Sequence, residues 1–258
     1  MPADRSPADG GTTVRLARID TPTGPRPVVQ DGDLWAVVVD HHAAVLERTG
    51  ETHPVDGARL LAPCEPRVVL GMAHNSGPAD RLVPPQAFTK SARTVIGPGE
   101  PVRLDPAAGK VVVEGELAIV IGRTARHLTP EQVPGVILGW TVGNDVTAYE
   151  QSALDDKFTQ SKNGDGFTPL GPWIETDLAT PGDLAIDVQV DGATQAEAST
   201  SGLAWDVVEQ LVYLTSHLTL GPGDVVLTGS PSTSAHVVPG QTSSVTIEGV
   251  GTLTNPIV

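Results

Sequence analysis

The sequence predicts a mostly β fold with some α-helix, of the α+β class. Short apolar runs of alternating polarity recur along the chain and are separated by Gly, Pro and Asp turns, a pattern typical of β-strands. One stretch, residues 203–220, instead has the spacing of an amphipathic helix, with apolar side chains at Val207, Val208, Leu211, Val212 and Leu214. We assign this helix to packing rather than to function. At 258 residues the chain fits one sizeable domain with a smaller appendage.

The composition favours a small-molecule ligand. A formal net charge of −15 argues against nucleic acid and anionic membrane surfaces, because both require a basic face. Cys64 is the only cysteine, which excludes an intrachain disulfide and a cysteine-based zinc cluster. No apolar run approaches the roughly 18 residues of a membrane span, and the first residues have no apolar signal segment. We therefore expect a cytoplasmic protein.

The chain divides into three segments. Residues 1–12 have almost nothing to bury and are predicted to form a disordered tail. Residues 13–63 are predicted to form a small N-terminal β domain, in which Asp31-Gly32 marks a hairpin. His41 and His42 follow its second hairpin strand, and we expect both at the surface. Residues 64–258 form the larger domain.

Polar segments follow several strands of the larger domain. The strand at residues 67–74 ends in His74 and opens into a loop too rich in proline for a long helix, which is a typical position for a lid. Lys162 lies in a loop with Gly-Asp-Gly that follows a polar, weakly helical stretch, and a surface lysine is the alternative for it. Further on, Gly229-Ser230-Pro231 forms a turn that offers backbone amides and a hydroxyl to an anion.

A pair of glutamates lies within the apolar run VVVEGELAIVIG at residues 111–122. Glu114 and Glu116 are two residues apart, so on a strand both side chains project from one face. Asp145 ends the next apolar run, at residues 135–146. Three carboxylates are a suitable ligand set for a hard divalent cation, whereas the alternative is a solvated strand face. The buried character of the surrounding strand favours the metal.

The motifs GPGEPVRL, VEGELAIVIG, GWTVGNDVTA, SKNGDGFTPLGPWI, LTLGPGDVVLTGSP and IEGVGTLTNPI resemble the fumarylacetoacetate hydrolase family, in the same order, from Arg67 to Val258. The resemblance implies a mixed β-roll catalytic domain, usually dimeric, that holds Mg²⁺ or Mn²⁺ through Glu114, Glu116 and Asp145. It also implies reactions next to a carbonyl group of a keto or diketo acid, as in aromatic catabolism. Lys162 matches the substrate-site lysine of the family. Ser230 stands where the family turn TGTP has its second threonine.

Two stretches of the sequence depart from the family pattern. Family members commonly have a GxNYxxH stretch whose histidine activates water, but here Ala73 and His74 replace the Asn-Tyr pair and Gly77 replaces the histidine. Tyr149 replaces an arginine that would pair with a substrate carboxylate, and a phenol cannot make that bidentate charged contact. The substrate then lacks that carboxylate or binds it through Lys162.

Three functional hypotheses follow. The first is a metal-dependent hydrolase or lyase that breaks a carbon–carbon bond through a stabilised enolate; decarboxylation suits the missing histidine better than hydrolysis, since it needs no activated water. The second is a keto–enol isomerase or tautomerase in which His74 or Lys162 moves the proton. The third is a binding subunit that has lost catalysis. The candidate catalytic residues are Lys162 and His74, and the candidate substrate-binding residues are Lys162, Tyr149, Gly229 and Ser230.

Overall fold

The computed structural model describes residues 14–43, 45–178 and 181–258, so the predicted tail at residues 1–12 lies outside the described part. Two β-sheets with few helices make up this part, which confirms the α+β class. The larger sheet has 13 strands. They are β1 (Arg15–Ile19), β2 (Arg26–Asp31), β3 (Leu34–Val38), β4 (Arg48–Pro54), β5 (Val69–Ala73), β6 (Gln86–Lys90), β7 (Val95–Ile96), β8 (Val111–Ile121), β9 (Ile137–Asn144), β10 (Thr147–Ala148), β11 (Thr168–Glu175), β14 (Val225–Leu227) and β15 (Ser234–Val237).

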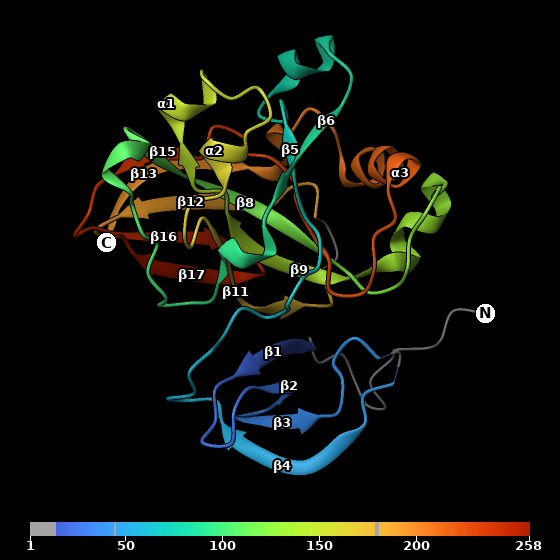
Figure 1. Ribbon diagram of the computed structural model, residues 1–258. Coiled ribbons are helices and arrows are strands. Elements are labelled where there is room, and N and C mark those ends of the chain that lie inside the picture. Colours follow the sequence, from blue (N-terminus) through green and yellow to red (C-terminus); the bar gives the residue numbers. More distant parts are fainter. Residues whose placement is uncertain (1–13, 44, 179–180) are drawn as a thin grey trace.

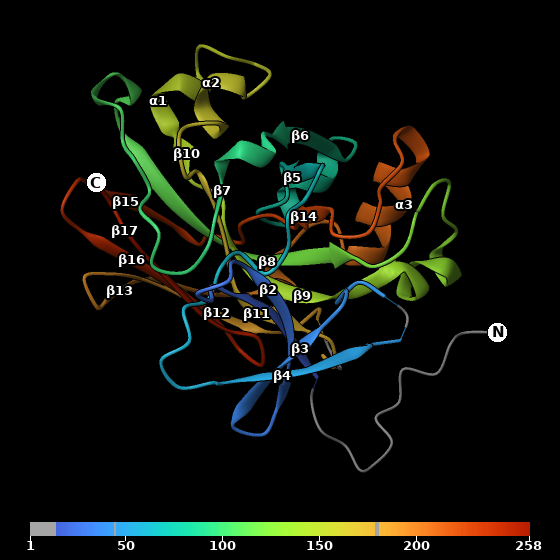
Figure 2. The same cartoon turned by 60° about the horizontal axis from the view of Figure 1, so that its bottom comes forward.

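The strands β1 to β4 form an antiparallel group below the rest of the chain in Figure 1, and the same group comes forward in Figure 2. The hairpin predicted at Asp31-Gly32 is confirmed, because it joins β2 to β3. The group has its own apolar cluster around Trp35. Its edge strand β1 pairs with β11, so the larger sheet continues from this group into the rest of the chain.

The expectation that His41 lies at the surface was wrong. His41 is only 3% exposed, and its Nδ1 atom lies 3.3 Å from the carbonyl oxygen of Ala17 on β1. The expectation treated both histidines as a continuation of the preceding strand, but residues 41–42 form a turn after β3. This turn folds the two imidazoles together, with 3.1 Å between the Nε2 atoms of His41 and His42.

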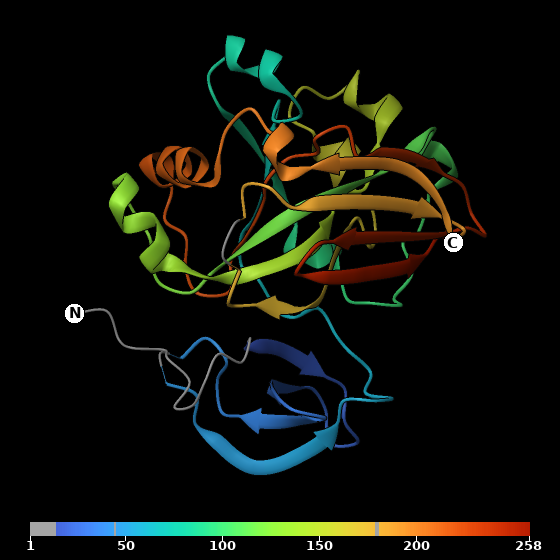
Figure 3. The same cartoon turned by 180° about the vertical axis from the view of Figure 1, so that it is seen from behind.

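The longest strand, β8, changes its partners halfway along its length. Strands β10 and β15 pair with its first residues, Val111 to Glu114, whereas β9 and β14 pair with its second half. A smaller sheet packs against it, with the strand order β13-β12-β16-β17, and in Figure 3 these orange and red strands lie in front of β8 and β9. Its strands are β12 (Ala185–Val190), β13 (Ala193–Ser199), β16 (Thr242–Ile247) and β17 (Gly251–Pro256).

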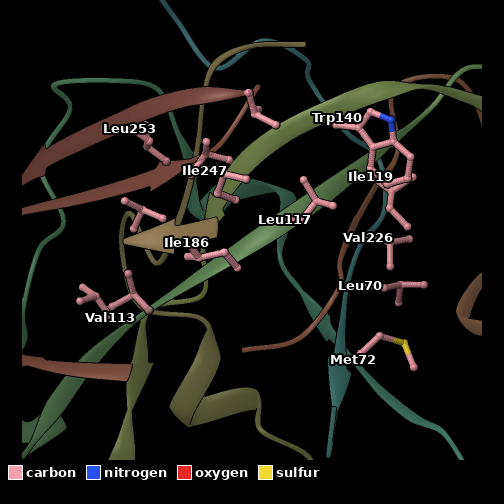
Figure 4. Packing of buried hydrophobic residues seen from close by; sticks show 14 of the residues in the cluster. Leu70, Met72, Val113, Leu117, Ile119, Trp140, Ile186, Val226, Ile247 and Leu253 are labelled. Carbon is pink, nitrogen blue, oxygen red and sulfur yellow. The ribbon is translucent and has the colours of Figure 1, made fainter. Parts of the chain in front are cut away.

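The main core lies between these two sheets. In Figure 4, Leu117 and Ile119 of β8 lie among Trp140 of β9, Ile186 of β12 and Ile247 of β16. Leu70, Met72 and Val226, from the neighbouring strands β5 and β14, extend the same cluster. The strand that carries the glutamates is therefore held by apolar packing over most of its length.

The predicted amphipathic helix is confirmed as α3 (Val207–His217), which buries Leu211 and Leu214. Asp206 and Glu209 cap its first turn reciprocally. The remaining helices are short: α1 (Tyr149–Ser152), α2 (Thr159–Lys162), and the 3₁₀ segments η1 (Pro78–Leu82), η2 (Ala92–Thr94), η3 (Pro106–Ala108), η4 (Pro130–Val136) and η5 (Thr200–Gly202). The proline-rich loop thus forms only a single short 3₁₀ segment, η1, which projects at the same end of the molecule as α1 and α2 (Figure 1). No helix among the described residues is long and apolar enough to cross a membrane.

Candidate active site

Two adjacent strands bring the three predicted carboxylates together. Glu114 and Glu116 lie on β8 at the point where its partner strands change, and Gly115 between them pairs with Asn144, the last residue of β9. Asp145 follows directly, and its N–H donates to the carbonyl oxygen of Glu114 at 2.9 Å. Glu116 and Asp145 are each 2% exposed, whereas Glu114 is partly exposed. The side chains expected to form a metal site therefore converge in a mostly buried cluster.

Lys162 joins this cluster from the end of α2. Its Nζ donates to Glu114 Oε2 at 3.0 Å, to Thr147 Oγ1 at 2.7 Å and to Asp145 Oδ2. The lysine is 7% exposed, and its ammonium lies 4.8 Å from the centroid of the Phe88 ring. The alternative of a surface lysine does not fit this position, since the side chain points into the molecule and spans two of the three carboxylates.

A second buried lysine was not predicted. Lys90 is 1% exposed, and its Nζ lies 2.5 Å from Asp145 Oδ1 and 3.3 Å from the carbonyl oxygen of Val146. The sequence did carry a signal for it. Phe88 and Lys90 are two residues apart on β6, so the alternation of the strand places both on one face, and a phenylalanine marks that face as buried. Thr147 was also missed, although it lies two residues after Asp145.

The Gly229-Ser230 turn supports the cluster from another side. The Gly229 N–H donates to Glu116 Oε2 at 2.7 Å, so this amide is directed at a carboxylate of the protein itself. Gly229 has a φ of +108°, and a Cβ there would come within 2.3 Å of the carbonyl oxygen of Asn75, so only glycine fits. Ser230 Oγ lies 2.7 Å from Thr233 Oγ1. Asn75 is itself fixed, because its amide nitrogen donates to the carbonyl oxygens of Trp205 and Thr228.

The charges in the cluster perturb one another. Burial raises the pKa of the Glu116 carboxyl well above its usual range, and the neighbouring Asp145 and Glu114 carboxylates raise it further. Burial alone would raise the pKa of Asp145, but Lys162 and Lys90 hold it below its ordinary value. Burial would lower the pKa of Lys162, yet Asp145 and Glu114 raise it above its ordinary value. Burial also lowers the pKa of Lys90, against the pull of Asp145.

His74 and Tyr149 occupy more exposed positions. His74 follows β5 directly, has a φ of +53° and is exposed. It begins the loop in which Asp80 Oδ2 accepts hydrogen bonds from the N–H of Ser76 at 2.8 Å and from that of Gly77 at 3.2 Å. Tyr149 is 61% exposed, and the Nζ of Lys110 lies 5.6 Å from its ring centroid. Both side chains are thus exposed, in contrast to the buried Glu116, Asp145 and Lys162.

The donor set of the cluster fits a hard divalent cation. Glu114, Glu116 and Asp145 supply only carboxylate oxygens, the ligands that hard divalent cations prefer. Within the described residues, no three acidic, histidine or cysteine side chains are already arranged to hold a metal ion. In this arrangement the ammonium groups of Lys90 and Lys162 lie against both oxygens of Asp145 and one oxygen of Glu114.

Comparison with known proteins identifies the family. Residues 65–258 match the family described as Fumarylacetoacetate (FAA) hydrolase C-terminal, and residues 14–63 match the one described as Rv2993c-like, N-terminal. The chain is 38% identical to Protein Rv2993c of Mycobacterium tuberculosis, over 95% of this chain and 98% of the relative. It is 31% identical to maleylpyruvate hydrolase of Aquipseudomonas alcaligenes, over 93% of this chain and 81% of the relative.

A solved structure supports the same assignment. The structure of 5-carboxymethyl-2-hydroxymuconate delta-isomerase from Mycobacterium smegmatis matches with a TM-score of 0.89 and 38% identity, covering 95% of this chain and 99% of that chain. The match extends over both the strands β1 to β4 and the sheets that carry the carboxylate cluster. The chain therefore belongs to the fumarylacetoacetate hydrolase family.

Proposed function

We propose that the chain is a divalent-metal-dependent enzyme that breaks a carbon–carbon bond next to a carbonyl group of a keto or diketo acid, with decarboxylation as the leading reaction. The observation that carries the proposal is the position of the Lys162 ammonium within hydrogen-bonding distance of two of three converging carboxylates. The maleylpyruvate hydrolase and delta-isomerase relatives support chemistry of this general kind.

The residues of the cluster would have different roles in this reaction. Glu114, Glu116 and Asp145 would hold a Mg²⁺ or Mn²⁺ ion, which would act as a Lewis acid toward the substrate oxygens. Lys162 would place a positive charge beside the anion that develops when the bond breaks. Lys90, in contact with Asp145 and buried behind it, would keep that carboxylate in position. Phe88 closes one side of Lys162 and keeps water from its ammonium.

The loop after β5 favours decarboxylation over hydrolysis. The family histidine is replaced by Gly77, whose N–H is directed at Asp80. Hydrolysis needs a base that activates water. Loss of CO₂ instead moves the bonding electron pair into the substrate's own carbonyl group, and the resulting enolate needs a positive charge beside its oxygen and then a proton, but no activated water. Lys162 would supply that positive charge in the carboxylate cluster, where two lysines contact Asp145.

Isomerisation is the second candidate. Two solved structures that each cover 95% of this chain carry isomerase names, the delta-isomerase above and 2-hydroxyhepta-2,4-diene-1,7-dioate isomerase from Mycobacterium marinum. An isomerase would use the same enolate and would need one group to move a proton. The candidates for the group that moves this proton are His74, which is exposed at the start of the loop after β5, and Lys162.

Product analysis separates these reactions. The metal-stripped chain should be incubated with oxaloacetate, acylpyruvates and longer diketo acids, with and without Mg²⁺. We expect metal-dependent release of CO₂ from a keto acid. Release of two carboxylic acids from a diketo acid would indicate hydrolysis, and a shift in the keto–enol absorbance alone would indicate isomerisation. A chain that binds the metal but turns over none of these compounds would contradict an enzymatic role.

A variant of His74 tests the proton donor. The side chain is exposed, so His74→Ala should change the free energy of unfolding by no more than about 0.5 kcal/mol. A fall in kcat of about a hundredfold with unchanged metal affinity would assign the proton to His74. Turnover within a few-fold of the unmodified chain would leave the proton to Lys162 or to water.

A further inference from the structure

The ammonium group of Lys162 has no proton left to offer a substrate in this arrangement. An ammonium has three N–H donors, and those of Lys162 are directed at Glu114 Oε2, Asp145 Oδ2 and Thr147 Oγ1. Two of these three acceptors are carboxylate oxygens that belong to the proposed metal ligands. Lys162 therefore occupies the same oxygens that a divalent cation would need.

Thr147 differs from the other two acceptors. It is 4% exposed, and its hydroxyl accepts from Lys162 while lying 2.8 Å from Glu114 Oε2 and 2.9 Å from the carbonyl oxygen of Asp145. Because the hydroxyl has one proton, it donates to one of these two oxygens and accepts from the lysine. As a neutral group it attracts a divalent cation less than a carboxylate does. Its contact with Lys162 can thus persist when the carboxylates turn to a metal.

The Phe88 ring provides a second contact of this kind. The ring lies 4.8 Å from the Lys162 ammonium and is itself held against Gly71, where a Cβ would come within 2.2 Å of the ring. Lys90 meanwhile remains on Asp145 Oδ1 and on the carbonyl oxygen of Val146, on the opposite oxygen of the carboxylate from Lys162. Thr147 and Phe88 are therefore two contacts of the Lys162 ammonium that do not involve the carboxylates.

We propose that Lys162 is a resident counter-ion of the carboxylate cluster, that a divalent cation displaces it from Glu114 and Asp145, and that Thr147 is the positioning residue that then holds the freed ammonium for an anionic substrate. The inference rests on the proposed function and adds the order of events. The metal binds before the substrate, because only then does Lys162 have N–H groups free to donate. Thr147 gains a role that neither the sequence motifs nor the carboxylate cluster assigned to it.

The first test measures metal affinity without substrate. Mn²⁺ is titrated by calorimetry into the metal-stripped chain, into Lys162→Met, and into Lys157→Met as an exposed control lysine from the same segment. Removal of a competing positive charge should lower the Kd of Lys162→Met by about tenfold and leave the control unchanged. A Kd for Lys162→Met that is equal to that of the unmodified chain, or higher, would overturn the proposal.

Lys162→Met leaves three carboxylates facing a single lysine, so its metal-free form can be too unstable for calorimetry. Thermal unfolding with and without Mn²⁺ then replaces the titration. A larger Mn²⁺-induced rise in Tm for Lys162→Met than for the unmodified chain supports the competition. An equal or smaller rise contradicts it.

The second test follows the anion, with oxalate as the probe. Oxalate is titrated into the Mn²⁺-loaded chain and into Mn²⁺-loaded Thr147→Val and Thr147→Ser. Thr147→Val removes the anchor of Lys162 and a hydroxyl beside Glu114 Oε2, but it changes no charge of the carboxylate ligands. It should therefore weaken oxalate binding about tenfold while the Mn²⁺ affinity stays within about threefold. Thr147→Ser should restore the oxalate affinity. Unchanged oxalate binding in Thr147→Val would show that the Thr147 hydroxyl does not position the Lys162 ammonium.

The outcome of these two binding tests does not depend on whether the proposed reaction is correct. Absence of turnover on every keto and diketo acid would remove the proposed function, yet the two titrations would still decide the role of Lys162 and Thr147. Conversely, a fully active enzyme whose Lys162→Met variant binds Mn²⁺ no more tightly would keep its function and lose this inference.

Discussion

At the carboxylate cluster, three acidic side chains face two ammonium groups in a region that water reaches poorly. Glu114 and Asp145 each contact a lysine, whereas Glu116 accepts from the Gly229 N–H and lies beside the other two carboxylates. Burying such a group is unfavourable unless opposite charge compensates it. A bound divalent cation would provide that compensation, and Glu116 would gain the most from it.

Glu116 is therefore the residue whose charge matters most for metal binding. Glu116→Gln keeps the size of the side chain and removes its charge, so we expect the Mn²⁺ affinity measured by calorimetry to fall by at least tenfold. Glu131→Gln, at an exposed position on η4, serves as the charge-matched control and should bind as the unmodified chain does. An unchanged affinity in Glu116→Gln would remove this residue from the metal site.

Residue patterns identified part of this cluster in advance. The spacing of Glu114 and Glu116 on one strand predicted their common face, and the end of the next apolar run added Asp145. The resemblance to the family added the role of Lys162. Lys90 was missed because it lies far from Asp145 in the sequence. In the strand order, β8, β14 and β5 separate β6 from β9, so only the complete fold brings the Lys90 side chain to Asp145. Thr147 was missed because its role depends on a hydroxyl proton that no sequence pattern specifies.

Among the elements, β8 determines where the glutamates lie. Gly115, between them, faces the smaller sheet, and a Cβ at this position would lie 2.7 Å from Val188 Cγ2 and 2.8 Å from Val245 Cγ1. The absence of a side chain thus lets β12 and β16 pack directly behind the two carboxylates. Any residue larger than glycine at position 115 would have to move the side chains of the smaller sheet.

Gly115→Ala should therefore destabilise the fold. We expect the free energy of unfolding in urea to fall by about 1–3 kcal/mol, which is typical of an overpacked core. Gly135→Ala is the control, because a Cβ there meets nothing within 4 Å. If Gly115→Ala unfolds at the same urea concentration as the control, the close packing of the second sheet on β8 is not important for stability.

The turn after β3 makes stability depend on pH. Burial, together with the neighbouring His42, lowers the pKa of His41 from 6.5 to about 4, although the Ala17 carbonyl oxygen and Asp40 act in the opposite direction. Above pH 6.5 neither the folded nor the unfolded chain protonates this residue. Between pH 6.5 and about 4 only the unfolded chain binds the proton, so stability falls as the pH falls.

The loss attributable to His41 across this range is about 3 kcal/mol, from the size of the pKa shift. His41→Gln should flatten the fall in unfolding free energy between pH 6.5 and 4, as measured by urea unfolding at several pH values. His236→Gln, at an exposed position on β15, is the matched control. A slope in His41→Gln as steep as in the control would show that other groups cause the pH dependence.

For the whole molecule, the strands could be located from the sequence but not their pairing. The apolar alternation around residues 13–20 predicted β1, yet nothing local indicated that β1 would pair with β11, about 160 positions further along the chain. The same holds for β8, whose two halves pair with different strands from the second half of the chain. Such long-range contacts depend on the packing of the complete core, whereas the helix α3 follows from local spacing and its cap.

Assembly of the whole molecule is a further expectation. Family resemblance and exposed short strands suggest a homodimer with much of the contact formed by residues 64–258. Light scattering at micromolar concentration should give twice the chain mass of 26.7 kDa. A single-chain mass under these conditions would contradict the dimer.

The metal dependence of turnover tests most directly the proposal that Glu114, Glu116 and Asp145 form a divalent-metal site that supports enolate chemistry. Turnover of the best keto or diketo acid should be measured as a function of Mn²⁺ concentration for the metal-stripped chain and for Glu116→Gln. We expect no turnover in EDTA, half-maximal turnover at the Kd found by calorimetry, and a parallel shift of both quantities in Glu116→Gln. Full turnover in EDTA, or a calorimetric shift in Glu116→Gln without a change in the metal dependence of turnover, would contradict it.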